Sequence, residues 1–203
     1  MKTKSMLPKQ KTVKTSMDDT NRIFSIAQKI VQKTGTRDPF AAAKFCGVEI
    51  MRADYFTKLL GMYMICLQHR VIFLNTKADL FLQRTVCAHE LGHDMLHRAQ
   101  ARSHALCELT LFREKTVMEY QANAFAAHFL IDTQESLEAA QCGMCISQMA
   151  GMFGVEEELV LIKLQELQRL GYPLRIPREP NGAFLKKAML APENRVGGYP
   201  LVE

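Results

Sequence analysis

Apolar residues recur every three or four positions along most of the chain, which is the spacing that places them on one face of an α-helix. Asp18 or Asp19 can cap the first such stretch, and the pair Asp38-Pro39 is a typical start for the second. We therefore expect helices over residues 18–33, 38–45, 80–97, 117–131, 134–141, 145–153 and 156–170.

A different pattern lies between the second and third of these helices. Residues 48–52 alternate like a strand, and two apolar runs, 60–67 and 70–75, flank the dipeptide Gln68-His69. That spacing predicts a β-hairpin with an exposed His69 at its tip, although the turn lacks the preferred Asn-Gly. The expected fold class is α+β, a mostly helical domain with a small antiparallel β-sheet beside the third helix.

Composition divides the chain into four parts. Residues 1–17 contain few large apolar side chains and are predicted to form a disordered basic tail. Residues 18–132 contain the strands and the longest helices and form the core. Residues 133–171 form a helical C-terminal subdomain, and residues 172–203 form an irregular tail rich in Pro and Gly, with a short helix expected over 183–190.

The composition is that of a globular protein, with 48% hydrophobic and 23% charged residues. No apolar run approaches the roughly 20 residues that cross a bilayer, and the N-terminus lacks the apolar segment of a signal peptide. We therefore expect a cytoplasmic protein without a membrane partner. The net charge of +5 matches the five lysines that precede the first acidic residue, Asp18, so the remainder is close to neutral.

The segment 147–155, together with the amphipathic helix after it, has the rhythm of a helix-turn-helix unit. A helix that reads DNA is normally basic at its start, whereas this one begins Glu156-Glu157-Glu158 and would repel phosphate. These acids argue against nucleic acid as a direct partner and against a transcription factor. We interpret the unit as a packing element or as a docking surface for another protein.

The most informative motif is His89-Glu90-Leu91-Gly92-His93, which reads H-E-x-x-H within an apolar helical run. Four residues advance a helix by slightly more than one turn, so both histidines project from one face. Two neutral imidazoles in this arrangement can bind one zinc ion. Glu90 lies about 100° round the helix, where its carboxylate can act on a water beside the metal as a general base and then as an acid.

Two histidines leave a catalytic zinc site incomplete, because such sites usually have three protein ligands. Glu119 shares the apolar face of the next long helix, so its carboxylate points inward and needs a partner. His97 lies one further turn along the motif helix, where a straight helix cannot easily bring it to the same ion. His104 falls in the polar stretch between the helices. Glu119 is the preferred third ligand, with His97 and His104 as alternatives.

These motifs resemble the ImmA/IrrE family of metallopeptidases. The resemblance covers roughly residues 20–170 and rests on His89-Glu90-x-x-His93 and on a downstream Glu119-x-x-Ala122-Asn123 motif. It implies a zincin-like core over residues 18–132, a Zn²⁺ cofactor and Glu119 as the third ligand. It also implies that the substrate is a helix-turn-helix repressor of a phage, a mobile element or a stress regulon.

Other residues can assist the predicted site. Asn123, one turn beyond Glu119, can orient that ligand from outside. The sequence leaves open which residue stabilises the oxyanion, and the candidates are Tyr120, His97, His128 and Tyr63. Asp94, next to His93, is expected to be a charge on the helix surface.

The six cysteines are expected to be reduced thiols. Cys142 and Cys145 form a CxxC pair, but a zinc knuckle would need a second pair at suitable spacing, and the sequence has none. We interpret them as ordinary thiols at a helix junction.

The sequence therefore predicts a zinc-dependent endopeptidase that cleaves a repressor. The alternative is a non-catalytic protein that sequesters the repressor through its C-terminal helices and has only a structural zinc site. The presence of Glu90 favours the enzyme, because a structural site does not need that carboxylate.

Overall fold

The computed structural model describes residues 16–102, 105–108 and 116–174. These residues form an α+β fold that is mostly helical. The elements in chain order are α1 (Met17–Thr34), α2 (Pro39–Phe45), β1 (Glu49–Ala53), β2 (Gly61–Cys66), β3 (His69–Asn75), α3 (Leu80–Leu96), α4 (Arg98–Ala101), β4 (Leu106–Glu108), α5 (Val117–Leu130), α6 (Thr133–Gln141), α7 (Ile146–Phe153) and α8 (Glu157–Arg169).

The sheet is four-stranded, in the order β1-β3-β2-β4. β2 pairs with β3 and β4 antiparallel, but β1 pairs with β3 parallel, so the prediction of an antiparallel sheet was wrong at this edge. The reason is that β3 folds back from β2 and inserts beside β1, so that both run in the same direction. Alternation within a strand carries no information on which strand lies next to it.

The predicted hairpin of β2 and β3 is present, with its turn one residue earlier than expected. Leu67 and Gln68 occupy the turn with φ of 47° and 69°, which is the geometry of a two-residue turn without glycine. His69 is instead the first residue of β3. Its ring is exposed, as predicted, and its Nδ1 lies 2.9 Å from Glu49 Oε1.

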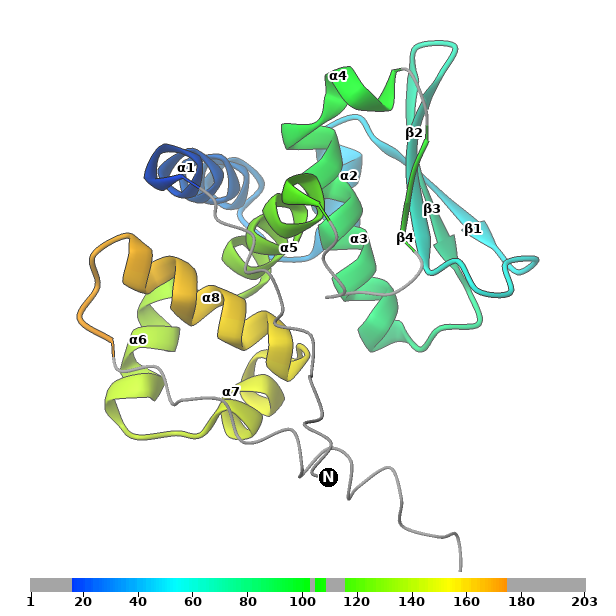
Figure 1. Ribbon diagram of the computed structural model, residues 1–203. Coiled ribbons are helices and arrows are strands. Elements are labelled where there is room, and N and C mark those ends of the chain that lie inside the picture. The colour runs from blue at the N-terminus through cyan, green and yellow to red at the C-terminus, as the bar shows by residue number, and fades with distance from the viewer. Residues whose placement is uncertain (1–15, 103–104, 109–115, 175–203) are drawn as a thin grey trace, which may run out of the picture.

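α3 is the central element of the molecule. The sheet packs on one side of it and α5 on the other, with α1 beyond α5 (Figure 1). Tyr63, Ile72 and Leu74 of the sheet are almost fully buried in the core that α3 shares with these neighbours. Because α3 is covered on both sides, eleven of its residues are buried, including the polar residues of its motif.

Side-chain caps fix where the helices begin. Ser16, rather than Asp18 or Asp19, caps α1, since its hydroxyl accepts from the backbone N–H of Asp19 at 3.1 Å. The two aspartates lie in the first turn, where the helix dipole favours them. The cap also places residues 16 and 17 in the fold instead of the predicted tail. Asp38 caps α2 through the N–H groups of residues 40 and 41, as predicted.

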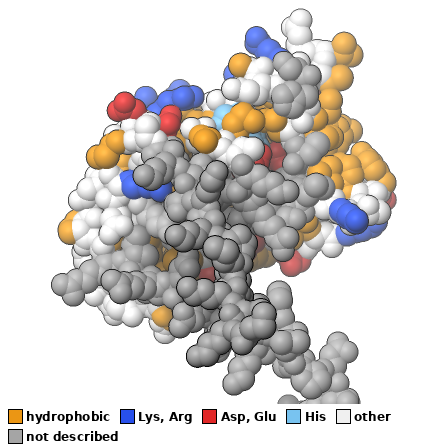
Figure 2. Space-filling view, viewed as in Figure 1, with side chains coloured by type: hydrophobic (Ala, Val, Ile, Leu, Met, Phe, Trp, Pro, Cys, Tyr) orange, Lys and Arg blue, Asp and Glu red, His pale blue; other side chains and the backbone are white. Residues whose placement is uncertain are grey.

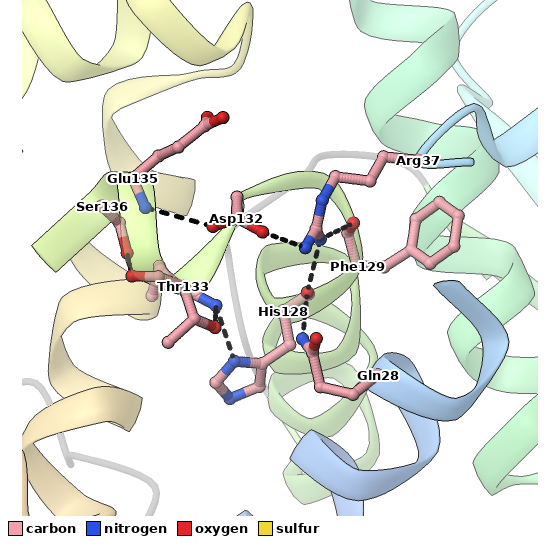
Figure 3. A network of polar contacts seen from close by, with 9 residues as sticks. Gln28, Arg37, His128, Phe129, Asp132, Thr133, Glu135 and Ser136 are labelled. Carbon is pink, nitrogen blue, oxygen red and sulfur yellow. Dashed lines mark hydrogen bonds and ion pairs between the residues drawn. The ribbon is translucent and has the colours of Figure 1, made fainter. Parts of the chain in front are cut away.

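The C-terminal helices α6, α7 and α8 gather at the lower left of Figure 1, and α8 packs directly on α5. Their junction with the core is polar (Figure 3). The Arg37 guanidinium donates to the Phe129 carbonyl at the end of α5, at 2.8 Å, and pairs with Asp132 at 2.6 Å. Asp132 in turn caps α6, so one arginine connects the ends of two helices to the start of α2.

No helix in the described part of the chain is long and apolar enough to cross a membrane. Several predictions fall outside the described residues, namely the disordered state of residues 1–15, the tail beyond 174 with its helix over 183–190, and any role of His104.

Candidate metal centre

His89, His93 and Glu119 meet at one point between α3 and α5. The Nε2 atoms of the two histidines are 3.1 Å apart, and Glu119 Oε2 lies 3.3 Å from the first and 3.6 Å from the second. Each residue offers one ligand atom, and these atoms all lie within 4.8 Å of one another. The structure thus brings together the three residues that the sequence placed on one site.

The spacing of the three donors fits a zinc ion. Ligand atoms about 2.0–2.1 Å from a tetrahedral centre are about 3.3 Å from one another, and the three observed separations bracket that value. The donor set of two imidazoles and one carboxylate is one that catalytic zinc sites use. In the described ranges, no other group of His, Cys, Asp or Glu gathers in this way.

The protonation states also suit a cation. Burial lowers the pKa of His93 to about 4, so its imidazole is neutral near pH 7 and keeps a lone pair for a metal. Burial alone would raise the pKa of Glu119, but hydrogen bonds from His89 and His93 outweigh it and lower this pKa well below the ordinary range. The cluster therefore presents a neutral imidazole at His93 and an ionised carboxylate at Glu119.

The outer nitrogens of both histidines have defined partners. His89 Nδ1 lies 2.8 Å from Asn123 Oδ1, so the ring donates there and leaves Nε2 unprotonated toward the cluster. His93 Nδ1 lies 3.0 Å from His97 Nδ1, and His97 Nε2 lies 2.9 Å from Gln121 Oε1. The amide oxygen can only accept, so His97 donates to it and accepts from His93. Both ligands are thereby held in the tautomer that a metal needs.

His97 therefore lies behind the cluster as an outer partner of His93. His97 follows His93 by one helical turn, which places it at this outer position. It does not belong to the group of candidate ligand residues. Asn123 contacts His89, which the sequence did not predict. Gln121 was missed, because its role depends on how α5 packs against α3, which no sequence pattern shows.

The other oxyanion candidates are engaged elsewhere. The Tyr120 hydroxyl donates to Glu166 Oε1 of α8 at 2.7 Å, and Tyr63 donates to Asp94 at 2.6 Å. His128 Nδ1 lies 3.2 Å from the ammonium of Lys163. The structure does not bring any of these three side chains into the His-His-Glu cluster.

Asp94 is fully buried, so its prediction as a surface charge was wrong. Its helix face is covered by the sheet, and its carboxylate accepts from three side chains: Tyr63 at 2.6 Å, Arg70 at 2.8 Å and Arg98 at 3.0 Å. These bonds compensate for the loss of hydration and hold α3 against β2 and β3. Its neighbour His93 faces α5 instead, since consecutive residues lie about 100° apart round a helix.

Glu119 is the most exposed member of the cluster, although its Oε2, the oxygen that faces the histidines, is buried. Both histidine side chains are at most 2% exposed, whereas that of Glu119 is 26% exposed. The donor atoms thus lie in an almost enclosed position, and the carboxylate is the member with the largest exposed fraction. Figure 2 shows hydrophobic side chains gathered on the right of this face, where Figure 1 places the sheet.

The thiols lie apart from this centre. Cys142 and Cys145 are exposed and unpaired at the end of α6 and the start of α7. Neither belongs to a group of possible metal ligands within the described residues. Cys87 is buried in α3, and burial raises its pKa, so it is a weak nucleophile.

Comparison with known proteins agrees with this geometry. The model of the IrrE N-terminal-like domain (Peptidase_M78) matches residues 46–165, which include the whole cluster. The "Uncharacterized immunity region protein 2" of Bacillus phage phi105 is 27% identical over 147 residues, which are 72% of this chain and 92% of that protein.

A solved structure described as a Mycobacterium tuberculosis transcriptional regulator has a similar fold, with a TM-score of 0.53 and 18% identity. The match covers 75% of this chain but only 50% of the other, so this chain spans about half of that structure. At this identity the likeness concerns the fold alone. The family match spans more than half of the sequence and contains the His-His-Glu cluster, and the chain therefore belongs to the family of the IrrE N-terminal-like domain.

Proposed function

We propose that this protein is a zinc-dependent endopeptidase. The observation that carries the proposal is the set of three donor atoms at tetrahedral spacing, within a motif H-E-x-x-H whose Glu directly follows the first histidine in the sequence. His89, His93 and Glu119 would hold the ion. When bound, zinc would polarise the scissile carbonyl and lower the pKa of a water molecule to about 7.

Glu90 is the proposed general base. It follows His89 on α3, and its side chain is fully buried on the side of the helix that faces β2. Its carboxylate takes a proton from the attacking water and returns it to the leaving amine. His97 and Asn123 act through the ligands, because they fix the orientation and tautomer of His93 and His89.

The proposed substrate is a helix-turn-helix repressor. Two facts support this choice, namely the resemblance to ImmA/IrrE peptidases and the similarity to a phage protein whose name assigns it to an immunity region. The reaction would take place in the cytoplasm, where such a repressor binds DNA.

The test is to load the purified protein with zinc and incubate it with the repressor encoded beside its gene. We expect two product fragments whose masses sum to that of the substrate plus one water. Chelation of the metal and the Glu90→Gln variant should each prevent cleavage. If the repressor is released from DNA without being cut, and Glu90→Gln releases it equally well, sequestration is the better account.

A further inference from the structure

β2 passes unusually close to α3 at Gly61. A β-carbon at this position would lie 2.4 Å from Val86 Cγ1, 2.8 Å from Glu90 Oε1 and 3.2 Å from Glu90 Cγ. β-carbons in proteins essentially never approach other heavy atoms closer than 3.0 Å. The space that any other residue would need is therefore already occupied, in part by the side chain of Glu90.

The requirement for glycine here is one of space. Gly61 does not have the positive φ for which glycine is usually needed, unlike Gly35, Gly47 or Gly154. The strand cannot easily retreat, because position 61 pairs with Leu74 of β3 on one side and with Glu108 of β4 on the other.

The side chains that face Gly61 cannot easily retreat either. Val86 is 1% exposed and branched at Cβ, so it has few alternative rotamers. Glu90 is fully buried, so a displaced carboxylate would have to enter packed protein. A methyl group at position 61 would thus push Glu90 away from its present position.

We infer that Gly61 is a positioning residue for Glu90: the bare backbone of β2 leaves the space in which the carboxylate of the general base is held. The inference rests on the proposed function, since it concerns the proton-transfer step. The motif helix fixes the backbone position of Glu90 but not the position of its carboxylate. The inference assigns that second task to the strand.

Gly92 provides a contrast on the opposite face of α3. A β-carbon there would lie 3.1 Å from the Ala122 carbonyl oxygen and 3.1 Å from Phe125 Cδ1, both in α5. Gly92 thus sets the separation of the two helices that carry the metal ligands. Enlarging Gly92 should weaken metal binding, whereas enlarging Gly61 should spare it and impair proton transfer.

The test is the Gly61→Ala variant, with Gly151→Ala as control, because position 151 is exposed and a β-carbon there meets nothing within 4 Å. We expect Gly61→Ala to bind one zinc per chain, to keep KM within about threefold, and to lose a factor of about 10² or more in kcat, within the usual range for general acid–base catalysis. The control should match the wild type. Wild-type kcat in Gly61→Ala would overturn the inference, as would a loss of zinc that accounts for the lost activity.

A second comparison tests whether Gly61 acts through Glu90. In a Glu90→Gln background, Gly61→Ala should lower kcat little further, because the carboxylate it displaces is already gone. Full additivity of the two losses would contradict the inference.

Two more variants cover the case in which Gly61→Ala does not fold. Gly61→Ala with Val86→Ala removes the 2.4 Å contact but leaves the new methyl group 2.8 Å from Glu90 Oε1. This double variant should fold and bind zinc, yet have a kcat well below that of Val86→Ala alone. Equal kcat in the two would mean that only crowding of Val86 matters, and the inference would fail.

If the wild type itself cleaves nothing, the proposed function fails, and the inference is tested by spectroscopy. With Co²⁺ in place of zinc, the visible spectrum of Gly61→Ala should change as that of Glu90→Gln does, while Gly151→Ala should leave it unchanged. A wild-type spectrum for Gly61→Ala would overturn the inference independently of any cleavage.

Discussion

At the scale of single residues, the centre consists of donors whose position is set by a second layer of side chains. The two imidazoles are buried, and each is oriented by a hydrogen-bond partner: Asn123 for His89, and His97 with Gln121 for His93. Because these partners lie on α3 and α5 themselves, the geometry of the site is set by the same two helices that carry the ligands.

We predict that Glu119→Ala greatly reduces zinc binding, because two histidines alone leave a catalytic zinc one ligand short. Zinc content after dialysis, measured by atomic emission, checks this. Glu157→Ala removes an exposed carboxylate from the first turn of α8 and should keep one zinc per chain. Equal zinc in both variants would exclude Glu119 as a ligand.

Asn123→Ala should weaken zinc binding about 10- to 100-fold, the usual effect of removing a hydrogen-bond partner of a metal-bound histidine. The expected cause is loss of the 2.8 Å contact that holds His89. Competition with a chromophoric chelator measures the affinity, and Asn21→Ala, on the exposed surface of α1, serves as the control. An unchanged affinity would show that helix packing alone orients His89.

At the scale of elements, the ends of α5 and α6 depend on one arginine from the α1–α2 connection. Arg37 satisfies a carbonyl that the end of α5 would otherwise leave without an intrahelical partner, and it pairs with the carboxylate that caps α6. The carbonyl of His128 also accepts from Gln28 of α1 at 3.2 Å. The junction between the core and the C-terminal helices is thus specified by hydrogen bonds.

Arg37→Met should lower the free energy of unfolding by about 1–3 kcal/mol, the range for loss of a hydrogen bond to a charged group at a partly buried site. Chemical denaturation with detection by circular dichroism measures it. Lys29→Met removes one exposed positive charge from α1 and should change stability by less than about 0.5 kcal/mol. Similar effects of the two changes would contradict the capping role.

At the scale of the whole molecule, the contact between α5 and α8 contains buried charge. Lys163 of α8 is fully buried, and its ammonium lies 3.0 Å from Thr133 Oγ1, 3.2 Å from His128 Nδ1 and 5.9 Å from the Phe24 ring centroid. Burial and then repulsion by Arg37 lower its pKa to about 7, against a smaller opposing effect of Asp132. On the far side of His128, Glu166 Oε2 lies 3.9 Å from Nε2.

This arrangement predicts a pH-dependent stability. The folded-state pKa of Lys163 lies below its ordinary value of 10.5, so the unfolded chain binds the proton more readily between about pH 7 and 10.5. The contribution of this lysine therefore makes the fold more stable as the pH rises through that window. In Lys163→Met, Tm should rise at pH 7 and depend less on pH between 7 and 10. Parallel Tm curves for the variant and the wild type would contradict this.

His128 affects the stability of the fold at lower pH. Burial lowers its pKa to about 4 from 6.5, so stability is present above pH 6.5 and is lost as the pH falls from 6.5 to 4. Its replacement by Gln should reduce the loss of Tm between those values. Thermal unfolding at pH 4.5 and 7 measures the change.

The sequence by itself determined the residues of the candidate site and most of the helices. Local rules place His89 and His93 on one face, and the apolar stripe of α5 turns Glu119 inward, so the three ligands could be predicted without knowledge of the fold. Caps such as Asp38 depend on neighbouring residues only and could also be read locally. Ser16 was missed because Asp18 and Asp19, two equally suitable caps, follow it within three residues.

Only the tertiary structure decided what depends on contacts between distant segments. Four features are of this kind: the parallel pairing of β1 with β3, the contact of buried Asp94 with Arg70, the place of Gln121 behind His97, and the close approach of Gly61 to Glu90. Each joins residues 22 to 29 positions apart in the sequence. Periodicity shows that a face is covered but not by which element, because many partners would bury the same apolar area. The identity of the covering element was therefore fixed only when α3 packed between the sheet and α5.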